Sequence, residues 1–467
     1  MSEALRLSTP RLIAYALPSV ALQSMLVPLY ITLPAFYYSP EVGLAPALVG
    51  LMFMLARAWE AITDPLIGAL SDRTRSRFGP RKPWMAVGAP IAIVSAWYLV
   101  HPPAGAHWSY LLALLMVFYA GWTMVFIPYQ AWGTELSSDY QERTRIAGFR
   151  EAGSFTGYLL ATVIPLAVLV WIAGIEAPEF GAQVQVIAWF FMAALAIGLL
   201  VCFVAVPAAP VLEDQSLKLR DLYGILGRNK PFVRLIVAFF LDRLAMGTYF
   251  ALQPLLVAGA LGLMSSFLII GVVISLTSIV AVPMWVALAR RIGKHRAYVL
   301  ANAITAACYV AFFFVPVGDA AVLIAVNALL GVGNGGTMVT PPAMTADTVD
   351  YDELQSGKQQ TGAHIAFLTF VFKLGMAVGA FVGLSFVALF GFESAVGPLT
   401  EQSTLGVRIG VALLPAAILL PAMILMWRFP IDRAEHDRIR GELERRRSAP
   451  RPANAGAAAG ALGVAQA

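Results

Sequence analysis

Two carboxylates and an arginine occur within one long apolar segment of this sequence, where ionisable side chains are unusual. Arg57, Glu60 and Asp64 follow one another at spacings of three and four residues, which places them on one face of a helix. With the hydroxyl of Thr63, the carboxylates could bind a small cation or a proton. Charged groups inside an apolar span are costly and mark ion or substrate pathways. We therefore predict a cation-coupling site here; the alternative is a structural Arg57–Glu60 ion pair with Asp64 as a helix-end cap.

Lys373 is the lone charged residue of another apolar segment, near 360–391. A buried ammonium needs a carboxylate partner. We predict that Lys373 pairs with Glu60 or Asp64 when the cation is absent, which would couple the two halves of the chain. The alternative is a side chain that snorkels to the membrane surface.

The elements that position these residues are membrane spans. The chain has 467 residues, of which 59% are hydrophobic and only 13% charged, about half of the roughly 25% typical of soluble domains. Apolar stretches of span length occur near 11–37, 45–70, 83–102, 109–134, 148–174, 184–207, 231–258, 264–289, 297–316, 321–346, 360–391 and 405–428. The composition therefore predicts an all-α integral membrane protein with twelve transmembrane helices.

The spans form two groups of six, which suggests two six-helix bundles. We predict a first bundle over 1–207, a cytoplasmic linker over 208–230, a second bundle over 231–430 and a cytoplasmic tail over 431–467 that is disordered at its end. Lys and Arg gather in the loops after every second span, which places both termini in the cytoplasm. The same pattern explains the net charge of +5 without nucleic acid, and the expected location is a bacterial-type inner membrane.

The two groups look like weak repeats. Thr123-Met-Val in the fourth span recurs as Thr337-Met-Val in the tenth. Internal repeats of this kind build transporters whose binding site lies between the halves. The Gly-rich run 331–336 within the tenth span predicts close helix packing or a bend near the cavity.

Charged residues at the cytoplasmic ends of the spans predict a gate that latches the halves together. Gly68 is expected to permit close helix approach, and the acidic run 347–353 is expected to pair with Arg143 and Arg145. The predicted gate residues are Gly68, Asp72, Arg73, Arg77, Gly79, Arg81, Arg143, Asp347 and Asp350. The alternative is a set of solvated topogenic loops.

Two strings resemble known transporters. Gly68-x-x-x-Asp72-Arg73 followed by Arg77-x-Gly79-x-Arg81 resembles the signature loop of the major facilitator superfamily. The longer string that starts at Ala56-Arg57-x-Trp59-Glu60 and continues through Asp64-Pro65 to Gly68 resembles the glycoside–pentoside–hexuronide:cation symporters, the melibiose carrier group. The acidic run 347–353 and Phe372-Lys373-Leu374-Gly375 match the same group.

The resemblance implies the major facilitator fold and alternating access. It also implies that Glu60 and Asp64 form the cation site and that Lys373 lies near it. Glu60 is a departure, because the sodium-using relatives carry Asp there, so the coupling ion is Na⁺ or H⁺.

The resemblance also identifies candidate substrate residues. Arg150 matches a sugar-binding arginine, whereas Phe126 replaces a sugar-contacting Asp, Met338 replaces an aromatic residue, and the first span offers Gln23 in place of an Asp. Further candidate lining residues are Tyr129, Gln130 and Trp132. Losing hydrogen-bonding groups disfavours a polyhydroxyl ligand.

The sequence thus predicts a secondary active transporter that couples a monovalent cation to a small organic solute of the sugar, glycoside or hexuronide class. The alternative is a carrier of a less polar amphiphile, a lysolipid-like molecule or an anion. An intramembrane enzyme built on Asp64 and Asp242 is disfavoured, because metal-spaced histidines and an activated nucleophile are missing. Asp242 and Arg243 are adjacent in the seventh span, and we predict that they do not pair and that one faces the cavity. The sequence calls for no cofactor, resident metal or obligate protein partner.

Overall fold

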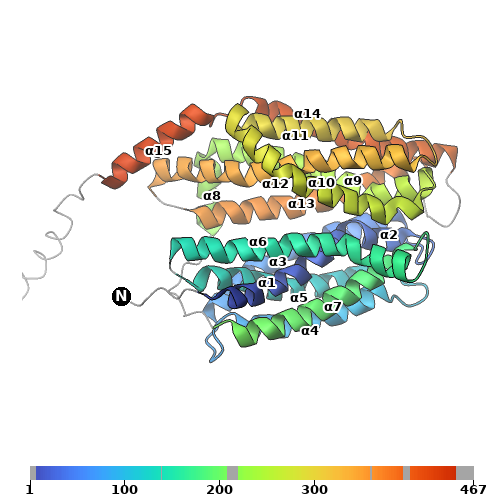
Figure 1. The fold of residues 1–467 in the computed structure, drawn as a ribbon, viewed down its shortest axis with the longest axis horizontal. Helices are drawn as coiled ribbons and strands as arrows, with labels where there is room; N and C mark the ends of the chain where they lie inside the picture. The colour runs from blue at the N-terminus through green and yellow to red at the C-terminus, as the bar shows by residue number, and fades with distance from the viewer. Residues whose placement is uncertain (1–6, 138, 208–218, 358–359, 393–399, 449–467) are drawn as a thin grey trace, which may run out of the picture.

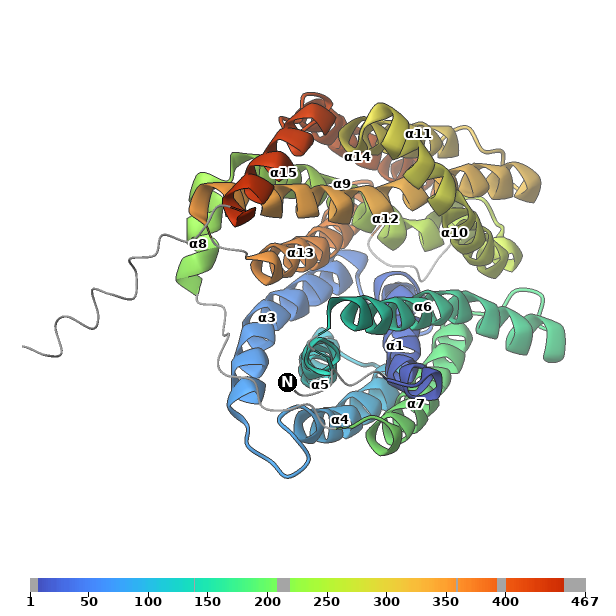
Figure 2. The same cartoon turned by 60° about the vertical axis from the view of Figure 1, so that its left-hand side comes forward.

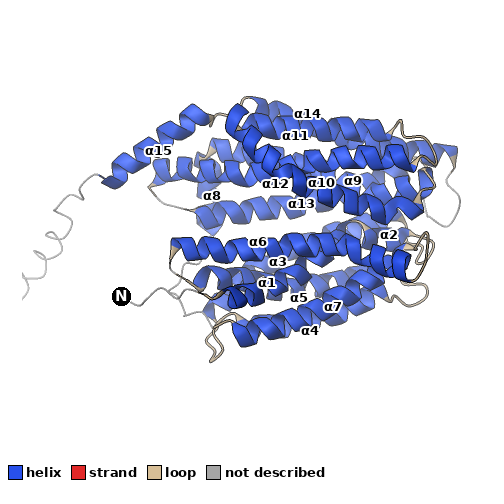
Figure 3. Ribbon diagram, viewed as in Figure 1, coloured by secondary structure: helices blue, strands red, loops and turns tan. Residues whose placement is uncertain are grey.

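The structure of the protein is a computed structural model that describes residues 7–137, 139–207, 219–357, 360–392 and 400–448. Helices and loops make up this part of the chain, and none of its residues lies in a strand (Figure 3). The helices of the first half are α1 (Thr9–Tyr30), α2 (Thr32–Tyr38), α3 (Pro46–Arg73), α4 (Lys82–Val100), α5 (Trp108–Glu135), α6 (Tyr140–Pro165) and α7 (Phe180–Ala205). Those of the second half are α9 (Lys230–Pro254), α10 (Phe267–Ile292), α11 (Lys294–Phe312), α12 (Ala320–Ser356), α13 (Thr361–Ala388) and α14 (Glu401–Trp427).

The two halves form two separate helical bundles that lie side by side (Figures 1 and 2). In the first bundle α1 packs against α6 and α7, and α5 packs against α3 and α4. In the second, α9 packs against α13 and α14, and α12 against α10 and α11. The bundles meet mainly where α3 faces α13 and α6 faces α10. The prediction of two six-helix bundles in an all-α integral membrane protein is confirmed.

Eleven helical segments of the described chain are long and apolar enough to cross a membrane. The remaining predicted span, 297–316, corresponds to α11, which begins at Lys294 with His295 and Arg296 and ends at Phe312. Its apolar part is therefore shorter than in the neighbouring helices. It nevertheless packs between α12 and α14 as a full member of the second bundle.

A break separates α1 from α2 within the first predicted span. Ile31 has φ −122° and ψ −67°, outside the helical region. The cause is Pro34, because a proline has no N–H for the carbonyl four residues earlier and its ring clashes with that carbonyl. The carbonyl concerned belongs to Tyr30, and the helix ends there.

Two short helices flank the second bundle. α8 (Leu219–Arg228) lies within the predicted linker, and α15 (Arg433–Ser448) begins the predicted tail. Residues 208–218 and the tail end predicted to be disordered lie outside the described residues. Both helices lie at the end of the molecule where α1 begins, together with the loop between α3 and α4 (Figure 1). This loop carries Arg75 and Arg77. We call this end of the molecule the basic end and the opposite one, which carries α2, the far end.

Glycines let α12 approach its neighbours closely, as the Gly-rich run predicted. A Cβ added at Gly336 would lie 2.6 Å from Ala301 Cβ and 2.7 Å from a ring carbon of Trp285. Overpacking of this kind destabilises a well-packed interior by roughly 1–3 kcal/mol. Gly336→Ala should therefore lower the melting temperature of the detergent-purified protein. Gly148→Ala is the matched control, because a Cβ at Gly148 meets no atom within 4 Å; equal melting temperatures for the two variants would contradict the close approach.

Candidate functional site

The three charged residues of α3 meet Lys373 of α13 at the junction of the two bundles. Arg57 Nη1 donates to Glu60 Oε2 at 2.5 Å. Lys373 Nζ lies 2.5 Å from Glu60 Oε1 and 2.8 Å from Asp64 Oδ2. Thr123 of α5 donates to the other oxygen of Asp64 at 2.8 Å. The result is a cluster of two cations and two carboxylates that ties the bundles together, which we call the α3–α13 charge cluster.

Lys373 places its ammonium between the two carboxylates of α3. It contacts one oxygen of each, Glu60 Oε1 and Asp64 Oδ2. Glu60 is only 1% exposed and the Lys373 side chain 15% exposed. An uncompensated charge at such depth costs several kcal/mol, so the buried carboxylates need positive charge beside them, which Arg57 and Lys373 supply here.

The hydroxyl of Thr63 takes a different direction from the one predicted. It donates to the backbone carbonyl of Glu60 at 3.3 Å, within its own helix. Back-bonding of this kind is common for threonine in helices. Thr123 instead supplies the hydroxyl at the carboxylates, a contact that the sequence analysis missed although the Thr-Met-Val repeat marked the residue.

Arg57 is buried between aromatic rings. Its guanidinium carbon lies 4.9 Å from the ring centre of Tyr30 and 4.2 Å from that of Tyr119. Such cation–π contacts stabilise a desolvated arginine. Its Nε and Nη2 have no acceptor among the described residues, so Glu60 satisfies only part of the side chain.

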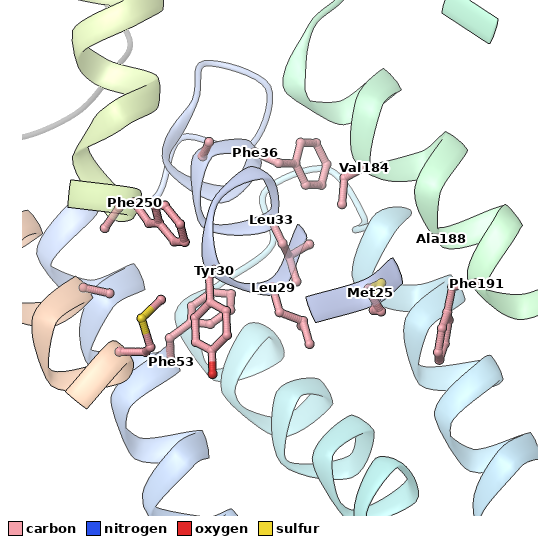
Figure 4. Close-up of a cluster of buried hydrophobic side chains, with 14 of the residues drawn as sticks. Met25, Leu29, Tyr30, Leu33, Phe36, Phe53, Val184, Ala188, Phe191 and Phe250 are labelled. Atoms are coloured by element: carbon pink, nitrogen blue, oxygen red, sulfur yellow. The ribbon is translucent and has the colours of Figure 1, made fainter. Parts of the chain in front are cut away.

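A cavity of about 330 Å³ lies beside the cluster and between the bundles. Residues of both halves line it, including Arg57 and Lys373. Of the predicted substrate residues, Gln23, Phe126 and Met338 belong to its walls. Tyr30 and Phe250 also line the cavity, and they belong to the cluster of buried side chains drawn in Figure 4.

Four predicted substrate residues lie outside these walls. Tyr129 donates to the backbone of Tyr15 at 2.7 Å, and Trp132 donates to Pro207 O. Both side chains are about 1% exposed. Their phase on α5 turns them toward α1 and the interior of the first bundle, so they pack the bundle instead.

Arg150 and Gln130 contact each other and do not line the cavity. Arg150 Nη1 donates to Gln130 Oε1 at 2.6 Å, and Arg150 Nη2 lies 2.8 Å from Glu151. Only Glu151 of these three lines the cavity. Arg150 therefore pairs with a residue of the cavity wall and is not part of that wall itself.

The bundles touch at the far end. Tyr38 donates to the carbonyl of Ala251 at 3.2 Å, which joins α2 to α9. The rings of Phe180 and Phe267 meet edge to face at 5.3 Å, which joins α7 to α10. These contacts join the two bundles at the far end.

At the basic end, the predicted gate residues pair within their own bundle. Arg81 contacts Asp72 at 2.5 Å and also binds Glu135, which fixes the turn that Gly79 makes with φ +85°. Arg73 and Arg77 are exposed. A Cβ on Gly68 would meet only ordinary contact at 3.7 Å, so close approach does not require glycine there.

The acidic run of α12 has partners other than the predicted ones. Asp347 pairs with Lys294 at 2.6 Å, and Asp350 pairs with Arg440 of α15 at 3.0 Å. Arg143 donates to the backbone of Ser137. The predicted pairing with Arg143 and Arg145 is absent among the described residues, because each charge binds a closer group of its own bundle.

The prediction that Asp242 and Arg243 do not pair is wrong. Arg243 Nη2 lies 2.9 Å from Asp242 Oδ2, and Tyr298 donates to the same oxygen at 2.9 Å. Adjacent Cβ atoms diverge on a helix, but the long arginine side chain folds back to the carboxylate. Arg243 also donates to Thr337 Oγ1 at 3.0 Å and lines the cavity, as predicted for one of the two.

The two Thr-Met-Val threonines thus have matching positions. Thr123 binds an ionisable group of the first bundle, Asp64, and Thr337 binds one of the second, Arg243. Two bundles with related polar contacts around a central cavity define a membrane transporter.

Comparison with known proteins agrees with this class. Residues 14–433 match the family described as MFS/sugar transport protein, and the chain belongs to this family. Its family and fold are those of membrane transporters, not of enzymes.

Individual relatives cover most of the chain. The chain is 26% identical to a glucuronide carrier protein homolog of Escherichia coli, over 88% of this chain and 90% of the relative. It is 24% identical to the sodium-dependent lysophosphatidylcholine symporter 1-A of Danio rerio, over 83% and 80%. The structure of a bacterial homolog of the human lysosomal transporter Spinster superposes with a TM-score of 0.64, at 12% identity, over 93% of this chain and 97% of that one. The symporters among the relatives support a cation-coupled transporter.

Proposed function

We propose that the protein is a symporter that couples Na⁺ or H⁺ to a small organic solute of the sugar, glycoside or hexuronide class. The observation that carries this proposal is the placement of Lys373 on both Glu60 and Asp64. A lysine of one bundle holds the carboxylates of the other, so the charge state of these carboxylates governs how firmly the bundles are joined.

The proposed coupling is a competition between Lys373 and the transported cation. A cation that binds Glu60 and Asp64 displaces the ammonium from α3 and removes a contact between the bundles. The cluster then carries one extra positive charge in a low-dielectric cavity, where solute binding and rocking can follow. A cation bound to both carboxylates stabilises the conformation that Lys373 has left. A solute that prefers this conformation binds more tightly when the cation is present, since a ligand shifts a conformational equilibrium by its differential affinity for the two states.

The proposed orientation places the basic end and both termini in the cytoplasm of a bacterial-type inner membrane. The basic loops at that end support it through the positive-inside rule. In this orientation the Tyr38–Ala251 and Phe180–Phe267 contacts lie on the side away from the cytoplasm, which supports a conformation that opens toward the cytoplasm. The gate would form when the bundles rock together, with Asp72, Arg81 and Asp347 exchanging partners.

A second candidate solute is a less polar amphiphile or a lysolipid-like molecule. Phe126 and Met338 give the cavity apolar walls in place of the hydrogen-bonding groups expected for a polyhydroxyl ligand. The lysophosphatidylcholine symporter among the relatives supports the same alternative.

A thermal-stability screen of the detergent-purified protein tests the proposal and separates these solutes. A ligand that binds only the folded state raises the melting temperature by mass action. We expect Na⁺, or acid in its place, to raise it and to strengthen stabilisation by a glycoside or hexuronide. A response to lysolipids and not to glycosides would favour the second candidate, and no cation or pH effect on any solute would refute coupling.

A further inference from the structure

A second buried charged network faces the cavity from the other bundle. Arg243 of α9 is only 3% exposed and lines the cavity. Asp242 and Thr337 contact its guanidinium at 2.9 and 3.0 Å. Tyr298 donates to the same oxygen of Asp242 at 2.9 Å. The coupling mechanism above does not use this network, although its position across the cavity from α3 is a costly place for an arginine.

Several donors of this network have no adequate acceptor. Arg243 Nε has none among the described residues, and its Nη1 reaches only the sulfur of Met246 at 3.2 Å, a weak acceptor. Arg57, on the opposite bundle, likewise has Nε and Nη2 without an acceptor in the described part of the chain. Buried unmet donors are costly. Both arginines line the cavity, and each keeps hydrogen-bonding capacity that its partners among the described residues do not use.

An aromatic pair joins the two arginines. The Arg243 guanidinium lies 5.6 Å from the ring centre of Phe372, and that of Arg57 lies 4.9 Å from Tyr30. Tyr30 and Phe372 meet edge to face at 6.5 Å. The cavity therefore has a guanidinium from each bundle, with aromatic surface between them.

We infer that Arg243 is a substrate-binding residue that holds the anionic group of an organic anion, a carboxylate or a phosphate. Planar guanidinium matches these groups with paired, charge-assisted hydrogen bonds. Arg57 is placed to supply further donors, and the aromatic surface accommodates the body of the molecule. This inference rests on the proposed function, because the displaced Lys373 and the bound cation leave a positive charge that an anionic solute neutralises.

Matched probes test the charge requirement. We would measure the binding of p-nitrophenyl glucuronide, p-nitrophenyl glucoside and p-nitrophenyl phosphate to the purified full-length protein by calorimetry and thermal shift. The first two differ only in a carboxylate against a hydroxymethyl group. We expect at least about tenfold preference for an anionic probe over the glucoside, which corresponds to about 1.4 kcal/mol. The glucuronide and phosphate arms distinguish the two anionic groups.

Variants of Arg243 test the residue. Arg243→Gln should abolish the preference, and Arg243→Lys should retain part of it. Arg234→Gln is the control, because Arg234 lies on the same helix outside the cavity walls. Since Arg243→Gln leaves Asp242 unpaired, the double variant Asp242→Asn with Arg243→Gln keeps the result interpretable if the single variant misfolds.

Three results would overturn the inference. The first is equal binding of the glucoside and the anionic probes, and the second is no binding of either anionic probe. The third is undiminished anion binding by both Arg243→Gln and the Asp242→Asn, Arg243→Gln double variant. Stabilisation by Na⁺ or acid should persist in these variants, because Glu60 and Asp64 are unchanged. If the wild-type protein showed no stabilisation by Na⁺ or acid but still bound the anionic probes, the coupling proposal would be overturned and the inference about Arg243 would stand.

Discussion

Replacing Glu60 with glutamine should abolish cation coupling. The carboxylate is almost completely buried and binds both Arg57 and Lys373. A neutral amide cannot compensate either cation, and losing one charge of a buried pair costs roughly 3–5 kcal/mol. We expect cation affinity to fall by on the order of 100-fold and uptake of the identified solute into proteoliposomes to lose its dependence on a cation gradient. Solute exchange between equal concentrations should persist.

The matched control for this variant is Glu142→Gln. Glu142 is also a buried carboxylate of the first bundle and also pairs with an arginine three residues away, Arg145. Unlike Glu60, it is not part of the α3–α13 charge cluster. Retained coupling in Glu142→Gln and lost coupling in Glu60→Gln would assign the effect to the α3–α13 charge cluster. Cation-driven uptake that is unchanged in Glu60→Gln would show that coupling resides elsewhere.

Charged residues inside apolar segments made this part of the site predictable. Arg57, Glu60 and Asp64 stand out because few other groups of their span are polar, and Lys373 because its span has no other charge. Burial leaves such groups few partners, so their pairing could be inferred without coordinates. The span pattern predicted the bundles for a similar reason, since hydropathy constrains a membrane helix more strongly than it constrains a soluble one.

Side-chain direction limited the remaining predictions. Tyr129 and Trp132 are near Phe126 in the sequence, yet helical phase turns them into the bundle while Phe126 faces the cavity. Asp242 and Arg243 diverge at Cβ, but the flexible arginine returns to the carboxylate. The spacing of residues in the sequence determines which face of a helix they share. It does not determine the rotamer of each side chain or which of several nearby groups that side chain binds.

The pairing of the gate residues depends on conformation, which a sequence does not specify. Asp347 binds Lys294 in the same bundle in this structure, while Tyr38 and Phe180 join the bundles at the far end. A transporter that rocks between two states must give some charged groups different partners in each. A sequence pattern can therefore identify such groups without identifying which partner they hold in one state.

Replacing Lys373 with methionine should separate cation binding from transport. Methionine keeps an unbranched apolar chain of similar length but removes the ammonium from Glu60 and Asp64. The two carboxylates then face only Arg57 and bind a cation without competition, so we expect Na⁺, or protons in its place, to bind at least about tenfold more tightly. Calorimetry or cation-dependent thermal shift measures this change.

Transport by Lys373→Met should fall to a small residual rate even though the cation binds better. Without the ammonium, the two carboxylates share a single internal cation, Arg57, when the transported cation leaves, so the empty carrier would have to return with an uncompensated negative charge. Lys230→Met is the control, because Lys230 is an exposed lysine of α9 and should change neither quantity. Weaker cation binding in Lys373→Met would mean that the lysine supports the cation site rather than competes for it, whereas tighter binding with lost net uptake would establish that one side chain links the two bundles to the charge state of α3.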